Sequence, residues 1–525
     1  MGLVKITLIN IPKLLSFINY TGTTTVPPLG LAYIASSLIK SGHEVQVVDA
    51  VGCRPLQFSP YTKIGKTQYF LQGLTYDEIV DRVDPESRLI ALSCMFTPQW
   101  PAVVRLIEKL KAHYPEKWIV VGGEHGTALP EYSLKSSRVD FVAMGEGEET
   151  AIALANQFDR LQDKEILQNI AGIAYRLDGE IKVNPRRARK KQLDEIPWPA
   201  WDIFPIPAYL ELNQPYGAPL GKSLPMLATR GCPYKCSFCS SDNMWTTLWK
   251  ARNVEDLVNE IEMYKKKYGV TDVHFMDLTA VVNRKWTIQF ADELLKRNMN
   301  ITWQMPSGTR SESFDAEVIE KIYSAGCRVF SFAPETGSPR MLKIIRKQVN
   351  LEHLLSAASA AVKRGMSVMC NIIVGFPQEE WKDLFYTYWF ILRCALHGVL
   401  EINLTAYIPL PGTEEYHKLM DQGRMPQPSE SYCLSLFSGA DIRTRRSWNE
   451  RFSAWQVSCM VLGGFVLFYT VAYLARPWRF FKLFGHLFKR KATSKTERVL
   501  LGMMDNRKMI LKGLLDAPIE GRLAG

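Results

Sequence analysis

Three cysteines stand close together in the chain, at Cys232, Cys236 and Cys239. Their spacing is C-x-x-x-C-x-x-C, and the loop that carries them follows an apolar, strand-like run at residues 224–228. Three thiolates at this spacing can bind three irons of a [4Fe–4S] cluster, which leaves the fourth iron open to a small molecule. A zinc knuckle is the alternative, but zinc usually takes four ligands, and the other seven cysteines are isolated. The pattern therefore predicts an iron–sulfur cluster with one open coordination position.

An aromatic residue, Phe238, stands directly before the last cysteine. The loop reads RGCPYKCSFC over residues 230–239 and resembles the cluster loop of the radical S-adenosylmethionine (radical SAM) superfamily. The resemblance implies that the open iron binds S-adenosylmethionine. It also implies an external electron donor, of the flavodoxin or ferredoxin kind, whose electron cleaves this cofactor to a 5′-deoxyadenosyl radical. Phe238 would pack against the cluster, or would be an ordinary core residue.

Residues 223–425 contain six strand-like runs, each followed by a helical segment. Six such units are two short of a complete TIM barrel, and they resemble the partial (β/α)6 barrel of radical SAM cores. The chemistry of such barrels lies at the carboxyl ends of the strands. The strands are expected at residues 226–228, 272–276, 301–305, 328–333, 367–374 and 401–407.

Candidate cofactor-binding residues follow these strands in order. Asp277 could receive the ammonium group of S-adenosylmethionine or make a structural hydrogen bond. Arg310 suits a carboxylate partner, and Glu335 resembles a family position whose carboxylate reaches the cofactor. The glycine and proline of the fifth turn could instead be architectural. The resemblance implies an S-adenosylmethionine site formed by Phe238, Asp277, Arg310, Glu335, Gly375, Pro377 and Tyr407.

Residues 1–155 alternate between strand-like and helical segments, with strands expected at 5–9, 44–49, 89–93, 118–122 and 141–144. This rhythm predicts a Rossmann-like, doubly wound parallel sheet, which binds ligands beyond the carboxyl ends of its strands. The loops there resemble those of the cobalamin-binding domain that precedes many radical SAM cores. A Rossmann-like domain without a cofactor is the alternative.

Glycines suit this edge because the backbone must lie flat against a large ring and its nucleotide tail. The Asp-x-His-x-x-Gly element, whose histidine ligates cobalt in the family, is absent, since residues 49–52 read DAVG. Any cobalamin is therefore expected without a histidine on its lower face. His125 could touch the nucleotide tail or lie in a surface loop. The candidate cobalamin residues are Asp49, Ser93, Gly122, Gly123, His125, Gly145 and Glu146.

Residues 156–222 form a connector between the two units. A hairpin is expected at residues 173–183, around the turn Asp178-Gly179. The stretch IPWPAWD at residues 196–202 is expected to be an extended crossover, because closely spaced prolines preclude a helix. The sequence thus divides into units at 1–155, 156–222, 223–425 and 426–525.

The last 85 residues carry most of the net charge of +11, with 16 Lys and Arg against 6 Asp and Glu. Residues 452–475 contain no charge and are long enough to span a bilayer. Residues 476–489 form a basic amphipathic helix of the kind that lies in a membrane interface. The prediction is a helical, basic region that contacts a membrane surface; a buried cap on the barrel and a transmembrane helix are the alternatives.

No signal peptide is visible, because residues 1–10 read as a strand. The protein is therefore expected in the cytoplasm, with a peripheral position at the inner face of the membrane as the alternative. No nucleic-acid partner is expected, because no RNA-binding module accompanies the aromatic and basic residues.

Together these features predict an enzyme that uses a [4Fe–4S] cluster, S-adenosylmethionine and cobalamin. The resemblance implies hydrogen abstraction from a carbon of the substrate, followed by methyl transfer from methylcobalamin. An oxidative cyclase of the same subfamily is the alternative, and a membrane-bound cobalamin or redox sensor without activity is a further one. The apolar, basic tail favours a hydrophobic small-molecule substrate such as an isoprenoid, a lipid or a porphyrin.

Overall fold

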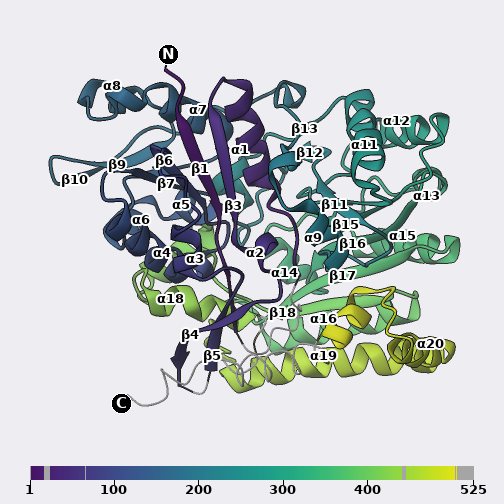
Figure 1. The fold of residues 1–525 in the computed structure, drawn as a ribbon. Coiled ribbons are helices and arrows are strands. Elements are labelled where there is room, and N and C mark those ends of the chain that lie inside the picture. The colour runs from purple at the N-terminus through teal and green to yellow at the C-terminus, as the bar shows by residue number, and fades with distance from the viewer. Residues whose placement is uncertain are drawn as a thin grey trace.

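A computed structural model describes residues 2–16, 24–65, 67–439, 441, 445–502 and 504. Two α/β units lie side by side, the N-terminal one in purple and blue and the second in teal and green (Figure 1). The first unit contains a seven-stranded sheet in the order β10-β9-β8-β7-β6-β1-β3. Five of its strands are parallel: β1 (Lys5–Asn10), β3 (Glu44–Asp49), β6 (Leu89–Ser93), β7 (Trp118–Gly122) and β8 (Phe141–Ala143).

Helices cover both faces of this sheet, which explains why its strands read as nearly continuous apolar runs. On one face the core includes Leu31 and Leu154, and on the other Val80 and Leu106. The predicted Rossmann-like fold is confirmed. The helices of this unit are α1 (Leu29–Lys40), α2 (Ala50–Cys53), α3 (Tyr76–Val80), α4 (Trp100–His113), α5 (Glu124–Ala128), α6 (Pro130–Lys135), α7 (Glu148–Asn156) and α8 (Lys164–Asn169).

The connector contributes to the same sheet. The expected hairpin is present as β9 (Ile173–Leu177) and β10 (Glu180–Val183), and it adds two antiparallel strands beyond β8. Helix α9 (Ile206–Leu212) follows the extended proline–tryptophan stretch. A second sheet that the sequence did not predict is formed by β2 (Lys13–Ser16), β4 (Phe58–Ile64) and β5 (Thr67–Gln72).

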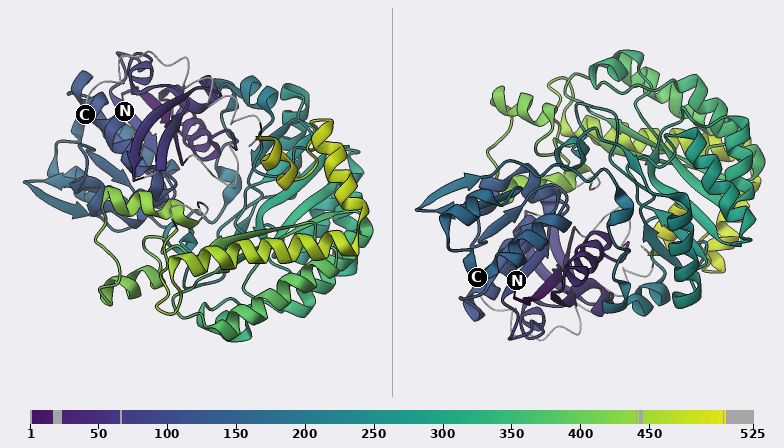
Figure 2. Two further views of the ribbon diagram at one scale, coloured as in Figure 1. Left: turned by 90° about the horizontal axis from the view of Figure 1, so that it is seen from below. Right: turned by 90° about the horizontal axis from the view of Figure 1, so that it is seen from above.

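The second unit is an open barrel of six parallel strands in sequence order, as predicted. Its side chains alternate, so that Phe330 and Phe332 face the helices while Ser331 faces the lumen. Figure 2 shows the strands as an arc with the helices on its outer side. The strands are β11 (Ser223–Met226), β14 (Asp272–Phe275), β15 (Thr302–Thr309), β16 (Cys327–Glu335), β17 (Ser367–Val374) and β18 (Glu401–Ala406).

The barrel helices fill the intervals between these strands. Helices α11 to α16 form the outer layer of the barrel, and two short strands and helix α10 precede them. These elements are β12 (Thr229–Arg230), α10 (Ser241–Trp245), β13 (Lys250–Ala251), α11 (Val254–Tyr268), α12 (Arg284–Lys296), α13 (Ala316–Ser324), α14 (Pro339–Ile344), α15 (Leu351–Arg364) and α16 (Trp381–Leu396).

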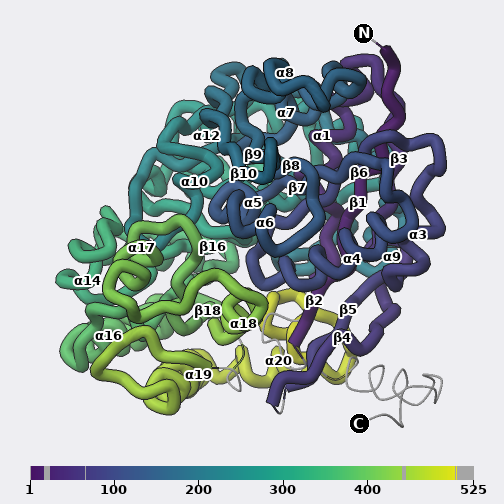
Figure 3. The backbone as a smooth tube through the Cα atoms, turned by 90° about the vertical axis from the view of Figure 1, so that its left-hand side faces the viewer, coloured from purple at the N-terminus to yellow at the C-terminus, as the bar shows by residue number. Residues whose placement is uncertain are grey.

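The C-terminal region is helical, as expected, and touches both units. Helix α17 (Glu414–Asp421) is followed by α18 (Glu430–Ser435), which packs against α4 of the first unit (Figure 3). Helix α19 (Ala454–Ala475) then packs along α16 and β18, and α20 (Trp478–Phe488) follows it. Helix α19 is long and apolar enough to cross a membrane, but one side of it is packed against the barrel.

Candidate functional site

The three cysteines lie in the loop between β12 and α10, beyond the first barrel strand. Gly231 precedes them with a φ of 91°, and a Cβ there would lie 2.0 Å from the Leu248 carbonyl oxygen. Only glycine therefore allows the chain to turn into this loop. Ser237 is tied to α14 by its backbone N–H, which donates to the Ile345 carbonyl over 3.1 Å. The loop is thus held from both sides.

The cysteine thiols are partly buried and close enough to interact electrostatically. Burial raises the pKa of the Cys232 and Cys236 thiols, and the nearby Lys347 and Arg310 act in the opposite direction. The Cys239 thiol lies within electrostatic range of both. In the part of the chain that the structure describes, no three Cys, His, Asp or Glu side chains are arranged to hold a single metal ion. Three separate thiolates with cations beside them fit a cluster, in which each thiolate binds a different iron.

Arg310, at the end of the third strand, reaches the cysteine loop. Its guanidinium lies 3.7 Å from the ring centre of Tyr234, which stands between the first two cysteines. Arg310 also donates to the Glu312 carboxylate over 2.8 Å. A cation over an aromatic face is held in place by this contact. Arg310 therefore presents a fixed positive charge beside the loop.

Glu335, at the end of the fourth strand, forms a buried ion pair with Lys347. The Lys347 Nζ lies 2.9 Å from the carboxylate, and both side chains are almost fully buried. Burial alone would lower the pKa of Lys347, but Glu335 and the Cys236 thiol raise it above its usual value. Glu335 has a φ of 68°, a left-handed conformation that is strained for a residue with a side chain. Strain of this kind is concentrated at functional sites.

An aromatic group joins the cysteine loop to the fifth and sixth strand ends. Phe376, between Gly375 and Pro377, packs edge-on against Phe238 at 5.6 Å and at a tilt against Tyr407 at 5.2 Å, measured between ring centres. The Tyr407 hydroxyl is buried and makes no hydrogen bond to any residue that the structure describes. Four predicted residues from three segments therefore meet around Phe376.

Asp277 is placed differently from the other predicted residues. Its carboxylate accepts hydrogen bonds from the backbone N–H of Ala228 (3.1 Å), from the N–H of Thr229 and from the Thr229 hydroxyl (2.6 Å). Burial raises its pKa to about 6. These contacts match the structural alternative, in which Asp277 anchors the start of the cysteine loop.

The two units meet directly beside the cysteines. Arg230, two residues before Cys232, donates to Glu146 over 3.1 Å and to Glu148 over 2.7 Å. All three side chains are largely buried, so the ion pairs are shielded from water. Glu146 belongs to the loop that follows β8, one of the predicted cobalamin-binding loops. The strand ends of the first sheet therefore face the cysteine loop.

A second contact strengthens this junction. Asn243, just after the cysteine loop, donates to Glu124 over 3.1 Å and to the Pro411 carbonyl over 3.0 Å. Glu124 follows the diglycine of β7, and burial raises its pKa to about 7. Three loops from distant parts of the sequence converge here. Neither Arg230 nor Asn243 was predicted, although the position of Arg230 beside the first cysteine was an available signal.

The predicted cobalamin residues share one edge of the first sheet. Ser93 and Gly122 are paired in register at the ends of β6 and β7. Gly123 has a φ of 108°, and a Cβ there would lie 2.6 Å from the Cys94 carbonyl oxygen. Gly145 also has a positive φ, of 76°, but the space around it is open. The edge therefore offers glycine backbone rather than side chains.

Asp49, a predicted cobalamin residue at this edge, already makes hydrogen bonds within the protein. Asp49 is buried and accepts from Asn10 (2.7 Å), from the N–H of Gly52 (2.9 Å) and from the Tyr209 hydroxyl (2.8 Å). It therefore fixes the turn after β3 and attaches the connector helix α9.

His125 is fully buried, so the alternative of a surface loop is wrong. Its ring stacks on Trp100 at 4.4 Å and lies 3.1 Å from the Thr97 hydroxyl, and burial lowers its pKa to about 3. The histidine is therefore neutral at physiological pH. Its Nε2 atom has no hydrogen-bond partner among the described residues, and a contact with a nucleotide tail stays a prediction.

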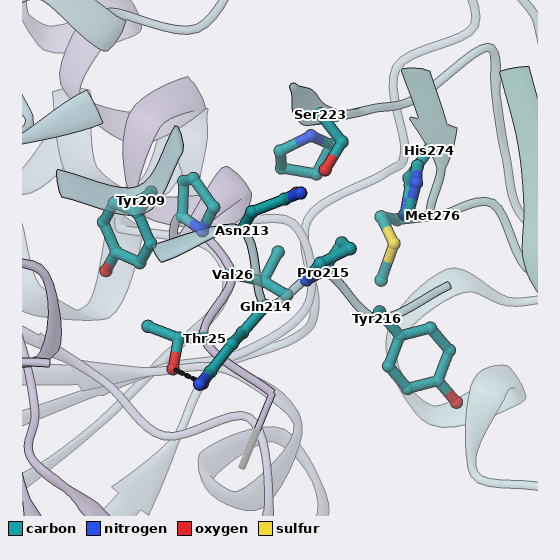
Figure 4. Close-up of a pocket in the computed structure, with 12 residues that line it drawn as sticks. Thr25, Val26, Tyr209, Asn213, Gln214, Pro215, Tyr216, Ser223, His274 and Met276 are labelled. Carbon is teal, nitrogen blue, oxygen red and sulfur yellow. Dashed lines mark hydrogen bonds between the residues drawn. The ribbon is translucent and has the colours of Figure 1, made fainter. Parts of the chain in front are cut away.

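A small cavity lies between the two units, away from the cysteines (Figure 4). Tyr209, Asn213 and Gln214 of the connector form one wall, and His274 and Met276 of the barrel form another. None of the predicted site residues lines it. A second cavity is lined by Gly145, Glu146 and Arg230 at the junction.

The barrel lumen carries polar side chains that the sequence alone did not single out. Asn371 of β17 is paired in register with Asn403 of β18, and both are half-buried. A Cβ on Gly308 would lie 3.3 Å from the Asn371 Nδ2 atom, so this amide extends toward β15. The hydroxyl of Ser331 is fully buried and finds no partner in the described part of the chain. The lumen therefore offers unused hydrogen-bonding groups.

Two family models match separate parts of the chain. A model described as a B12 binding domain matches residues 16–155, and a model of the Radical SAM superfamily matches residues 226–389. The cobalamin-dependent S-adenosylmethionine radical enzyme OxsB superposes with a TM-score of 0.66 at 16% identity, covering 98% of this chain and 80% of OxsB. At this identity the likeness shows the fold alone.

The sequence relatives include methyltransferases and a cyclase. An uncharacterized methyltransferase of Pyrococcus horikoshii is 28% identical over 79% of this chain and 82% of its own length. The cytidylyl-2-hydroxyethylphosphonate methyltransferase of Streptomyces wedmorensis is 27% identical over 80% and 83%. The anaerobic magnesium-protoporphyrin IX monomethyl ester cyclase of Rubrivivax gelatinosus is 26% identical over 75% and 67%.

Proposed function

Since the chain belongs to the cobalamin-dependent radical SAM enzymes, we propose that it transfers a methyl group to a carbon atom of its substrate. The junction between the units carries this proposal. The ion pairs of Arg230 with Glu146 and Glu148 bring the glycine edge of the first sheet to the cysteine loop. Methyl transfer to a substrate radical requires both cofactors to reach one substrate, and the junction supports this proposal because it holds the two predicted cofactor sites beside each other.

Cys232, Cys236 and Cys239 would hold the [4Fe–4S] cluster, and the edge from Ser93 to Gly145 would hold cobalamin. When bound, the cluster supplies the electron that cleaves S-adenosylmethionine, and cobalamin supplies the methyl group. The protein contributes binding and orientation, as in other cofactor enzymes. An external one-electron donor is therefore required.

Charged residues around the loop would bind the amino-acid end of S-adenosylmethionine. Lys347 and Arg310 can pair with its carboxylate, and Glu335 can accept from its ammonium group. The aromatic group of Phe238, Phe376 and Tyr407 would pack against the adenosine and keep water away. The unpartnered Tyr407 hydroxyl would then gain a hydrogen-bond partner.

The lumen refines the proposed substrate class. The apolar C-terminal region favours a hydrophobic molecule such as an isoprenoid, a lipid or a porphyrin. However, Ser331, Asn371 and Asn403 would be costly to cover with a purely apolar group, since buried polar atoms need partners. The substrate is therefore an apolar molecule that carries at least one hydrogen-bonding group near the carbon that reacts.

An oxidative cyclase is the second candidate, because the chain also resembles the cyclase of Rubrivivax gelatinosus. Anaerobic reconstitution with iron, sulfide and hydroxocobalamin, followed by S-adenosylmethionine and a reductant, separates the two. Retained cobalamin with 5′-deoxyadenosine and S-adenosylhomocysteine in step with product supports methyl transfer. Deoxyadenosine without S-adenosylhomocysteine on turnover supports the cyclase, and deoxyadenosine without retained cobalamin contradicts both.

A further inference from the structure

Helix α16, on the outer side of the barrel, exposes a row of aromatic side chains. Trp381, Phe385 and Trp389 follow one another at intervals of four residues, so they lie on one face of the helix. Each is more than half exposed, and Phe385 is 68% exposed. The opposite face, with Phe390 and Ile391, is buried in the core. The outward face is therefore not explained by packing against the residues that the structure describes.

Helix α19 presents a second uncharged row. Trp455, Leu462, Val466 and Leu474 are exposed, while Val461, on the opposite side, is buried. The whole helix lacks a charged residue. An exposed helix face of this length without a charge is unusual for a monomer in water.

The two rows form one surface because α16 and α19 run side by side in the same direction. Trp381 contacts Phe452 at 4.8 Å between ring centres, near the start of both helices. Midway, the Tyr388 hydroxyl donates to the Met460 carbonyl over 2.7 Å. At the far end, Arg476 donates to the Ala395 carbonyl over 3.0 Å. Figure 2 shows α19 lying along the outside of the barrel.

Helix α20 extends this surface and adds positive charge. Arg479 fixes it to the barrel by donating to the carbonyls of Gly398 (2.8 Å) and Val399 (3.1 Å). No residue of α20 is buried, and Phe488 is 90% exposed. Its polar positions are basic or neutral, with Lys482 exposed among the aromatic residues. Held in this way, α20 keeps its aromatic side chains on the outside.

We propose that the surface formed by the exposed residues of α16, α19 and α20 docks on a lipid bilayer that contains anionic lipids. Tryptophan and phenylalanine beside lysine are suited to the headgroup region, where the rings enter the apolar layer and the ammonium groups meet lipid phosphates. The surface consists of Trp381, Phe385, Trp389, Leu396, Trp455, Leu462, Val466, Leu474, Trp478, Phe480, Phe481, Lys482, Phe484 and Phe488.

Charge distinguishes the bilayer from a second copy of the chain. Neither α19 nor α20 contains Asp or Glu, and Asp383 of α16 is buried in an ion pair with Arg340. A symmetric dimer through this surface would bring the basic α20 helices toward the same interface, without acidic partners on these helices. An anionic membrane supplies the missing negative charge. The packing of α19 on the barrel places it in the interface rather than across the membrane.

Flotation with vesicles tests this inference independently of the reaction. The full-length, reconstituted enzyme is mixed with vesicles of phosphatidylcholine alone or of phosphatidylcholine with phosphatidylglycerol. We expect it to float with the mixed vesicles and at least about tenfold less with the neutral ones. The double variant Phe385→Ser/Trp389→Ser should lose about tenfold in binding, whereas Leu56→Ser, an exposed apolar residue of the first unit, should bind as the wild type.

Three results would overturn the inference: no flotation of the wild type, unchanged flotation of the double variant, or a dimer by light scattering that the double variant abolishes. Circular dichroism and thermal melting show whether the double variant is folded. If it is unfolded, Lys482→Glu replaces it, since this exposed position should lose only the preference for phosphatidylglycerol. Deoxyadenosine formation without vesicles should not change, so a failure of docking is distinguishable from a failure of the proposed reaction.

Discussion

The two parallel sheets of this protein present their strand ends to the same junction, yet the two edges differ in kind. At the barrel edge, charged and aromatic side chains surround the cysteine loop, with Arg310 on Tyr234 and Glu335 on Lys347. At the edge of the first sheet, glycines provide bare backbone, and the Asp49 carboxylate is already bonded within the protein.

This difference matches two classes of ligand. A small zwitterion such as S-adenosylmethionine is recognised by opposite charges and an aromatic wall. A large, flat ring system needs a surface without side chains, which glycine provides. One topology therefore supplies two chemically distinct sites, and the side chains at the strand ends decide which is which.

Removing a cysteine should have the largest effect and should act on one edge only. Cys236→Ala is expected to abolish 5′-deoxyadenosine formation, with a loss of at least about a thousandfold, because a cluster that lacks one of its three protein ligands is not stably held. Cobalamin should still bind. Iron content, the absorbance spectrum and product analysis measure both effects. Cys459→Ala, at an exposed cysteine outside the loop, is the control and should retain full activity.

Breaking the ion pairs of Arg230 at the junction should uncouple the two proposed cofactor sites without removing either one. Arg230→Met leaves the buried Glu148 without its ion-pair partner, which typically costs about 3–5 kcal/mol, while Arg189 still pairs with Glu146. We expect methyl transfer to fall more than deoxyadenosine formation, because the cluster ligands remain while the distance to the other unit is no longer fixed. Equal losses in both would contradict a positioning role. Lys5→Met, which breaks a more exposed ion pair, should change the free energy of unfolding much less.

The glycine edge can be tested with two matched substitutions. Gly123→Ala introduces a methyl group 2.6 Å from the Cys94 carbonyl oxygen, whereas Gly145→Ala meets no atom within 4 Å. Both positions have a positive φ, so each change costs about 1 kcal/mol from strain, and the first costs more because backbone must move. Cobalamin retained after gel filtration and the unfolding temperature measure the result. Similar stability for both variants would show that the close approach is unimportant.

Much of this arrangement was predictable from local signals. The cysteine spacing, the six strand–helix repeats and the hairpin at Asp178-Gly179 each depend on residues near one another in sequence. The contacts of Lys347, Arg230 and Asn243 were not predictable, because each partner is 12 to 168 residues away and no spacing rule links them. The hydrogen bond of Tyr209 to Asp49 was not predictable for the same reason, since Tyr209 reaches it from the connector.

The C-terminal region shows a different limit of prediction from the sequence. The sequence indicated an apolar helix and a basic helix, but the aromatic row of α16 belongs to a barrel helix whose pattern reads as ordinary core packing. Both faces of α16 are apolar, so the sequence cannot tell which one is buried. Only the packing of Phe390 and Ile391 into the core shows that the row from Trp381 to Trp389 is outside.

The turn after the fifth strand allows a smaller test of the barrel edge. Glu379 is fully buried and accepts from the N–H of Gly375, its second oxygen has no partner among the described residues, and burial raises its pKa to about 8. Because the folded-state pKa lies above the unfolded value of about 4.5, the folded state binds this proton more tightly. The contribution to stability is therefore complete below about pH 4.5 and is lost as the pH rises toward 8.

Glu379→Gln should match the wild type at pH 5 and exceed it by about 1–2 kcal/mol at pH 8, since the amide keeps an acceptor for Gly375 and cannot ionise. Thermal or urea unfolding at both pH values measures this difference, and subtracting the two proteins removes the titration of other groups. An equal pH dependence in both proteins would mean that the Glu379 carboxyl is solvated. In that case the turn would be open to water. The adenosine site proposed beside Phe376 would then lack the exclusion of water that distinguishes the strand ends of the barrel from the glycine-rich strand ends of the first sheet.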